Sequence, residues 1–130
     1  MKEEKTEGDG KMESYKELIV WQKAMDLVEE IYRLVKLLPK EEQYALSDQL
    51  RRAAVSIPSN IAEGYGRSQG REYVRFLNIA RGSKNEVETQ LLICVRLGYV
   101  PEGKINQAMQ MCDEVGKILN KIIKSLSPST

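Results

Sequence analysis

The chain has 130 residues, enough for one domain with a substantial apolar core, and 30% of them are charged, for a net charge of +1. It contains no histidine, which excludes the commonest general base, the Ser-His and Cys-His nucleophile pairs and most zinc sites, so we expect no enzyme, cofactor or metal site. No apolar run is long enough to cross a membrane and the first residues are charged, so the sequence predicts a cytoplasmic protein without a membrane partner.

Four amphipathic helices are predicted along the chain. Residues 1–14 carry three lysines, five acidic residues and almost no apolar side chains, which predicts a disordered charged tail. Apolar residues then recur at three-and-four spacing over about 17–37, 41–65, 69–97 and 102–126, and residues 127–130 are expected to fray. No strand pattern appears. Because the connections are short, the sequence predicts an all-α domain over residues 15–126, an antiparallel up-down-up-down four-helix bundle.

Cys94 and Cys112 are the two cysteines, and each falls at an apolar helical position. Reduced thiols in the core are therefore expected rather than a disulfide.

The second helix contains an unusual polar stretch, RRAAVSIPSNIAEGYGRS, with Pro58 at its middle. On a helical wheel a polar row lies beside the apolar stripe, made of Gln49, Arg52, Ser56, Asn60 and Glu63. Polar groups at such a border are partly buried and need hydrogen-bond partners. We interpret this polar row as a structural seam between helices or subunits. Contact with a ligand or nucleic acid is the main alternative, and catalysis a remote one.

Small residues in the second and third helices should let these two helices approach closely. They are Ala53, Ala54, Ala80, Gly82 and Ser83.

Residues 51–84 hold a basic set opposed by two acids, Glu63 and Glu72, for a net charge of +5. The basic set is Arg51, Arg52, Arg67, Arg71, Arg75, Arg81 and Lys84. A segment of this charge attracts phosphate or acidic protein surfaces. On the third helix an outward row is predicted at Arg71, Arg75, Asn78, Gly82 and Asn85. A solvated surface and an anion-binding row both fit it, although few aromatic rings lie nearby for base stacking.

Two segments are apolar on too many sides for one core face to cover them. They are LIVW at residues 18–21 and LLICVRL at residues 91–97. Helices of this kind are buried on more than one side, so a homo-oligomer is predicted. The expected interface residues are Leu18, Ile19, Trp21, Leu92 and Ile93.

Two other kinds of site are not supported. Glu86, Glu88, Asp113 and Glu114 could suggest a carboxylate-bound metal, but di-metal bundles use Glu-x-x-His pairs and the chain has no histidine. The sequence GYGRSQG lacks the Lys-Ser/Thr pair and the preceding strand of a phosphate-binding loop, so it is interpreted as a helix connector.

Three stretches carry a family resemblance: LIVWQKAMDL, YALSDQLRRAAVSIPSNIAEGYGR and FLNIARGSKNEVETQLL. They closely resemble the bacterial four-helix-bundle proteins encoded in intervening sequences of 23S ribosomal RNA genes, over about residues 15–100 and more loosely through the last helix. The accessory variability determinants of diversity-generating retroelements are distantly similar; they form five-membered barrels and bind nucleic acid and a reverse transcriptase. The resemblance implies a small, ring-like homo-oligomer, a homopentamer, without established enzymatic activity. The family's typical positions fall here on Gln49, Arg51, Arg52, Ser56, Asn60, Glu63, Gly64, Ser83, Glu86 and Gln90.

Two functional hypotheses follow. The first is a module that binds RNA or DNA, or accompanies a reverse transcriptase, through a basic surface of the second and third helices. The second is an oligomeric scaffold that binds another protein, with the arginines at the contact between subunits. A carboxylate-only enzyme is a distant third.

Overall fold

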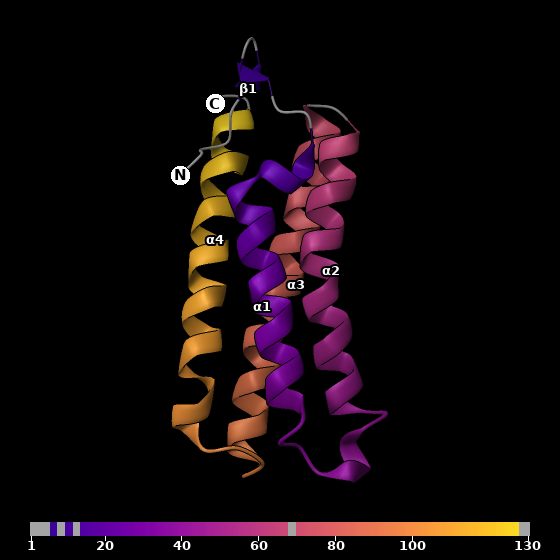
Figure 1. Ribbon diagram of the computed structural model, residues 1–130, viewed down its shortest axis with the longest axis vertical. Coiled ribbons are helices and arrows are strands. Elements are labelled where there is room, and N and C mark those ends of the chain that lie inside the picture. Colours follow the sequence, from indigo (N-terminus) through magenta and orange to yellow (C-terminus); the bar gives the residue numbers. More distant parts are fainter. Residues whose placement is uncertain (1–5, 8–9, 12–13, 68–69, 128–130) are drawn as a thin grey trace.

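The computed structural model describes residues 6–7, 10–11, 14–67 and 70–127, and four long helices dominate it (Figure 1). These are α1 (Ile19–Val35), α2 (Leu46–Gly66), α3 (Arg71–Arg96) and α4 (Asn106–Leu126), with short 3-10 helices η1 (Tyr15–Glu17), η2 (Lys40–Glu42) and η3 (Glu102–Ile105). Successive long helices run in opposite directions, and α4 packs back against α1. The predicted four-helix bundle is confirmed.

The expectation that the chain has no strands is wrong for one short segment. β1 (Thr6–Glu7) pairs antiparallel with β2 (Gly10–Lys11), Thr6 opposite Lys11 and Glu7 opposite Gly10. The overlooked signal is the Gly-Asp dipeptide between the two pairs, a composition typical of two-residue hairpin loops. The rest of the predicted tail up to residue 13, and residues 128–130 of the predicted frayed end, lie outside the described residues.

Helices α2 and α4 begin later than the sequence pattern suggested. After Pro39 and after Pro101 the chain first forms η2 and η3, and the α-helices start at Leu46 and Asn106. Oε1 of Glu42 accepts a hydrogen bond of 3.1 Å from the Leu46 N–H and so satisfies one of the free amides at the start of α2. Oε2 of the same carboxylate accepts a 2.7 Å bond from the Tyr99 hydroxyl, which ties this helix start to the α3–α4 connection.

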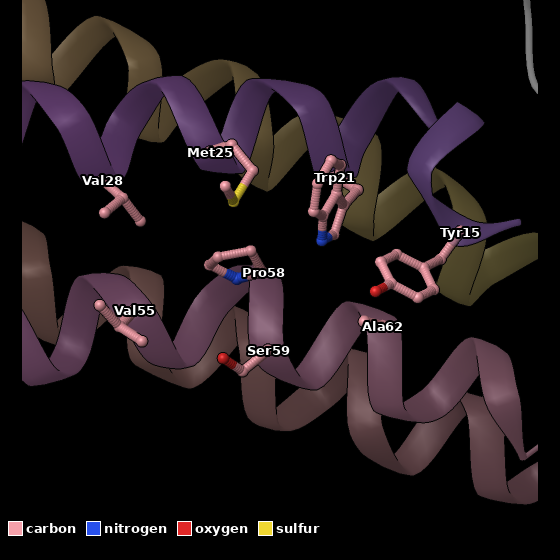
Figure 2. Close-up of a pocket in the computed structure, with 8 residues that line it drawn as sticks. All are labelled: Tyr15, Trp21, Met25, Val28, Val55, Pro58, Ser59 and Ala62. Carbon is pink, nitrogen blue, oxygen red and sulfur yellow. The ribbon is translucent and has the colours of Figure 1, made fainter.

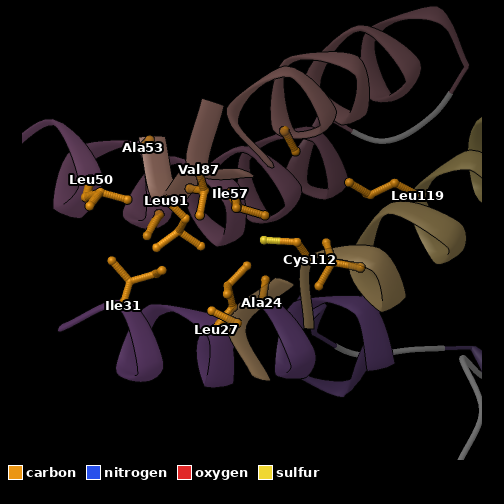
Figure 3. Packing of buried hydrophobic residues seen from close by; sticks show 14 of the residues in the cluster. Ala24, Leu27, Ile31, Leu50, Ala53, Ile57, Val87, Leu91, Cys112 and Leu119 are labelled. Atoms are coloured by element: carbon orange, nitrogen blue, oxygen red, sulfur yellow. The ribbon is translucent and has the colours of Figure 1, made fainter. Parts of the chain in front are cut away.

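One apolar core runs between the four helices (Figure 3). Its fully buried side chains include Leu27, Ile31, Ile57, Leu91 and Leu119. These residues come from all four helices, as the three-and-four spacing predicted.

Both cysteines are free and buried in this core. Burial raises the pKa of both thiols, and for Cys112, with a further contribution from the nearby Glu88 carboxylate, the pKa rises to about 12. The thiolate is the reactive form of cysteine, so neither side chain is poised as a nucleophile.

Helices α2 and α3 make the most extensive contact of the bundle, but not through all the small residues expected. Gly82 faces solvent, and a Cβ placed there would meet no atom within 4 Å. The two helices approach closely at Gly64, where a Cβ would lie 2.7 Å from Cβ of Phe76. Glycine is required at this crossing because the two backbones leave no room for a side chain.

Candidate binding surfaces

The polar row of α2 contacts α3 at its centre. The Ser56 hydroxyl lies 2.8 Å from the Ser83 hydroxyl, and Nδ2 of Asn60 donates to the carbonyl oxygen and the hydroxyl of Ser56 at 2.8 and 2.9 Å. Ser83 is buried, and Ser56 and Asn60 are half-buried. Each of these polar groups therefore has a partner, as a seam between two helices requires.

The other members of the row lie toward solvent. Arg52 forms an ion pair of 3.0 Å with Asp48 and its side chain is 79% exposed, so it lies outside the contact between α2 and α3. Glu63 pairs with Arg67 at 3.0 Å on the helix surface and likewise lies outside the contact between α2 and α3. Gln49 is exposed and accepts a long bond, 3.4 Å, from Gln90. At 100° per residue, Arg52 and Glu63 fall on the side of the row that is turned from α3.

Replacing Asn60 by leucine is expected to lower the free energy of unfolding by about 1–3 kcal/mol, because the Ser56 groups lose their donor. Chemical unfolding of the variant and of the wild type measures this change in the free energy of unfolding. Gln110→Leu, at an exposed position of α4, is the matched control and should change stability by less than about 0.5 kcal/mol. Equal stability of the two variants would contradict a structural role for Asn60.

The basic set does not form one continuous surface. One group lies at the junction of α2 and α3 and consists of Arg67, Arg71 and Arg75. The other group, Arg51 and Arg52, lies about 24 Å from Arg67 along α2. The two groups are this far apart because sixteen helical residues separate Arg51 from Arg67. A net charge summed over the sequence does not show this separation.

Two of the clustered arginines are held against one aromatic ring. The guanidinium carbons of Arg67 and Arg75 lie 5.4 and 4.6 Å from the centroid of the Phe76 ring. Arg75 also pairs with Glu72 at 3.2 Å, and this bond lowers the pKa of the Glu72 carboxyl. Arg71 is exposed, and no ion pair of its side chain is found within residues 14–67 and 70–127.

The remaining two basic residues serve the α3–α4 contact. Arg81 donates to Oδ1 of Asn120 at 2.7 Å and to Oδ1 of Asn78 at 2.6 Å. Lys84 pairs with Glu88 at 3.3 Å, its side chain is 13% exposed, and it packs on Gly116 of α4. Lys84 is therefore not available to a phosphate, which corrects its assignment to a nucleic-acid surface.

An apolar groove lies on the surface between α1 and α2 (Figure 2). It encloses about 350 Å³ and is lined by Tyr15, Trp21, Met25, Val28, Val55, Pro58, Ser59 and Ala62. We call it the α1/α2 groove. Met25 and Val55 are 38% and 41% exposed, so apolar surface faces solvent along it.

A more polar hollow of about 460 Å³ continues the groove past Val55. Its lining is Tyr32, Asp48, Arg51, Arg52, Val55 and Ser56. The groove thus has an apolar half toward the start of α1 and a basic half toward the start of α2.

A second apolar surface lies on the outer face of α3. Leu92, Ile93 and Leu97 are 48%, 39% and 55% exposed near the end of this helix. Of the other predicted interface residues, Trp21 lines the α1/α2 groove and Ile19 is half-buried. Leu18 is 4% exposed and belongs to the core of the bundle, so its assignment to an interface is wrong.

Sequence reasoning found Trp21 but missed the rest of the groove. The residues of each wall are spaced by four, three and four positions in the sequence. On α1 they are Trp21, Met25, Val28 and Tyr32, and on α2 they are Arg51, Val55, Pro58 and Ala62. Such spacing marks one face of a helix, here a face beside the core stripe.

Three of the four carboxylates considered as metal ligands pair with lysines. Glu114 pairs with Lys23 at 3.4 Å, Asp113 with Lys117 at 3.3 Å and Glu88 with Lys84. Within the described part of the chain no group of three or more metal-ligating side chains comes together. No described helix is long and apolar enough to cross a lipid bilayer.

Comparison with known proteins identifies the family. The family model of the 23S rRNA-intervening sequence protein matches residues 16–121. The chain belongs to this family. The family predicted from the sequence is thus confirmed, and the match includes most of α4 as well as both apolar surfaces.

The chain is also similar to a solved structure from Bacteroides thetaiotaomicron VPI-5482. That protein, of unknown function, is described as a member of the S23 ribosomal protein family. The two are 30% identical with a TM-score of 0.73, and the match covers 82% of this chain and 99% of the other. No curated protein matches the chain.

Proposed function

We propose that this protein is a self-assembling helical scaffold that works by binding rather than by catalysis. The observation that supports the proposal is uncovered apolar surface on two different sides of the bundle, the α1/α2 groove and the outer face of α3. Contiguous apolar patches of this kind usually mark interaction sites. The absence of histidine from the sequence and the high pKa of the buried Cys112 thiol argue against acid-base and nucleophilic catalysis.

Two unlike patches favour a particular kind of assembly. A contact between different surfaces of identical subunits is head-to-tail, and it produces a ring when the rotation closes. This agrees with the homopentamer that the family resemblance implies. A cytoplasmic location is part of the proposal, since both cysteines are kept as buried thiols.

The mass of the full chain in solution tests this function. Light scattering over a range of micromolar concentrations is expected to give a whole-number multiple of 14.8 kDa, five subunits if the ring is a pentamer. A mass of 14.8 kDa at every concentration would overturn the proposal.

Nucleic-acid binding is a second candidate, favoured by the three arginines at the α2–α3 junction. Arg71 is exposed there beside Arg67 and Arg75, and a ring would repeat this cluster once per subunit. The family is named for 23S rRNA, which makes RNA the first ligand to try. Contacts of this kind are to phosphates, so they carry little sequence preference.

Replacing both Arg71 and Arg75 by glutamate is expected to weaken RNA binding for all sequences and to lower the salt slope by about one unit per lost contact. Both side chains are exposed, so folding should be spared. Fluorescence anisotropy with a single-stranded RNA at several salt concentrations measures both effects. Absence of RNA binding by the wild type at low salt would leave only the scaffold function.

A further inference from the structure

We infer that the arginines at the α2–α3 junction bind single-stranded RNA by stacking: a base of the strand lies on the open face of the Arg75 guanidinium, and Arg71 contacts a phosphate. This inference rests on RNA binding, the second candidate function, and names the kind of RNA and the contact that recognises it. It follows from how Arg75 is held, from the charges around it and from the position of Arg71.

Arg75 is held by two neighbours on its own helix. Its guanidinium carbon lies 4.6 Å from the centroid of the Phe76 ring. Its Nε and one terminal nitrogen donate to the two carboxylate oxygens of Glu72, at 3.2 and 3.4 Å. These bonds are made at the edge of the guanidinium, because its N–H groups point outward in its own plane. The ring and the carboxylate therefore orient the group without enclosing it.

One face of this guanidinium remains open to a ligand. The Arg75 side chain is 57% exposed, although Phe76 and Glu72 both contact it. A guanidinium is planar, delocalised and weakly hydrated, so nucleobases stack on it as they do on aromatic rings. A side chain that is already oriented loses less conformational entropy when a base binds. Few aromatic rings lie at this junction, and the arginine plane backed by Phe76 takes their place.

The charges of the cluster favour stacking over attraction to phosphate alone. Three arginines stand against two carboxylates, which leaves a net charge of +1. Glu63 pairs with Arg67 at 3.0 Å. Glu72 pairs with Arg75 at 3.2 Å. A paired carboxylate repels an incoming phosphate and so weakens the attraction of its arginine. A base on the guanidinium face carries no charge and is compatible with the carboxylate at the edge.

Arg71 supplies the phosphate contact. It precedes Arg75 by four residues, which places the two on the same face of α3, about 6 Å apart along the helix axis. Arg71 is exposed, and across residues 14–67 and 70–127 its side chain forms no ion pair. A strand whose base stacks on Arg75 therefore brings its backbone within reach of an uncommitted positive charge.

The stack requires an unpaired base. Inside a duplex the faces of each base are covered by its neighbours, whereas the bases of single strands and loops can turn outward and stack on a protein. Every base has such a face, so the contact carries little sequence preference. Single-stranded RNA is therefore the ligand.

A substitution that conserves charge tests the stack on the full-length protein. Arg75→Lys keeps the positive charge but removes the planar group, and it is expected to weaken binding of a single-stranded oligouridylate about tenfold. The salt slope should stay within about half a unit of the wild-type value, because no charge is lost. Arg71→Lys is the matched control: it makes the same exchange one turn away, keeps a cation for the phosphate and should bind within about threefold of the wild type.

A duplex provides the second arm of the test. For an oligoadenylate–oligouridylate duplex, Arg75→Lys should leave the affinity within about threefold of the wild type, since paired bases offer no face to stack. Fluorescence anisotropy gives the affinities, and circular dichroism confirms that both variants are folded.

The outcomes separate RNA binding from stacking. A wild type that binds no oligouridylate at low salt would overturn both together. A wild type that binds, with affinity that falls equally in Arg75→Lys and Arg71→Lys or in neither, would overturn the stack and leave RNA binding intact. Equal weakening of strand and duplex by Arg75→Lys would overturn the requirement for an unpaired base.

Discussion

Replacing Gly64 by alanine is expected to lower the free energy of unfolding by about 2–3 kcal/mol, although alanine is the better helix former. The added Cβ would lie 2.7 Å from Cβ of Phe76 and 3.1 Å from the Tyr73 ring. Cβ of Phe76 is fixed by the α3 backbone, so the two helices must separate along their most extensive contact. The gain in helix propensity, up to about 1 kcal/mol, offsets only part of this cost.

Gly116→Ala is the matched control for this prediction. A Cβ at Gly116 would come nearly as close to a neighbour, 2.9 Å from Cε of Lys84, but that atom is near the end of a flexible side chain and can move. The free energy of unfolding of Gly116→Ala should stay within about 1 kcal/mol of the wild-type value. Chemical unfolding of the two variants compares a clash with a fixed backbone-attached atom and a clash with a movable side chain. If both variants lost the same free energy of unfolding, the close α2–α3 crossing would be contradicted.

Replacing Ile93 by glutamate is expected to weaken self-association by about a hundredfold or more. The change places a carboxylate in the apolar outer face of α3, which the proposed head-to-tail contact would bury against a neighbouring subunit. Folding should be retained, since Ile93 is 39% exposed in the single subunit.

The control for Ile93 is on the same helix. Ile79 is 40% exposed, but it lies fourteen residues before Ile93, about 21 Å along α3, and outside the apolar group of Leu92, Ile93 and Leu97. Ile79→Glu should therefore change the association constant by less than about tenfold. Sedimentation equilibrium gives the association constants of the two variants. If both constants fell equally, apolar exposure anywhere on α3, rather than the position of Ile93, would govern assembly.

The bundle was predictable because its signals are periodic. Each helix has apolar residues at three-and-four spacing, and this spacing alone assigns them to a buried face. Examples from the four helices are Leu27, Ile57, Leu91 and Leu119. The start of α2 was not predictable in the same way. Glu42 and Tyr99 are 57 residues apart, and their hydrogen bond depends on how the α1–α2 and α3–α4 connections meet.

The candidate surfaces were predicted in part. Trp21, Leu92 and Ile93 were found because an apolar run that surrounds a helix must leave some side chains outside the core. The basic set was misleading because sequence gives the charge of a residue but not its partner. Lys84 is covered by α4 and Arg52 is paired along its own helix, whereas Arg51 forms no ion pair among the described residues because Asp48, in the same hollow, pairs with Arg52.

Quenching of Trp21 fluorescence by acrylamide tests the head-to-tail contact most directly. Trp21 is the single tryptophan of the chain and lines the α1/α2 groove, whereas Ile93 lies on α3, diagonal to α1 in the bundle. Ile93→Glu can therefore change the surroundings of Trp21 only through a neighbouring subunit. We expect Trp21 to be shielded in the assembled wild type and to become markedly more quenchable in Ile93→Glu at the same concentration. Identical quenching in the two proteins, with the wild type assembled, would contradict it.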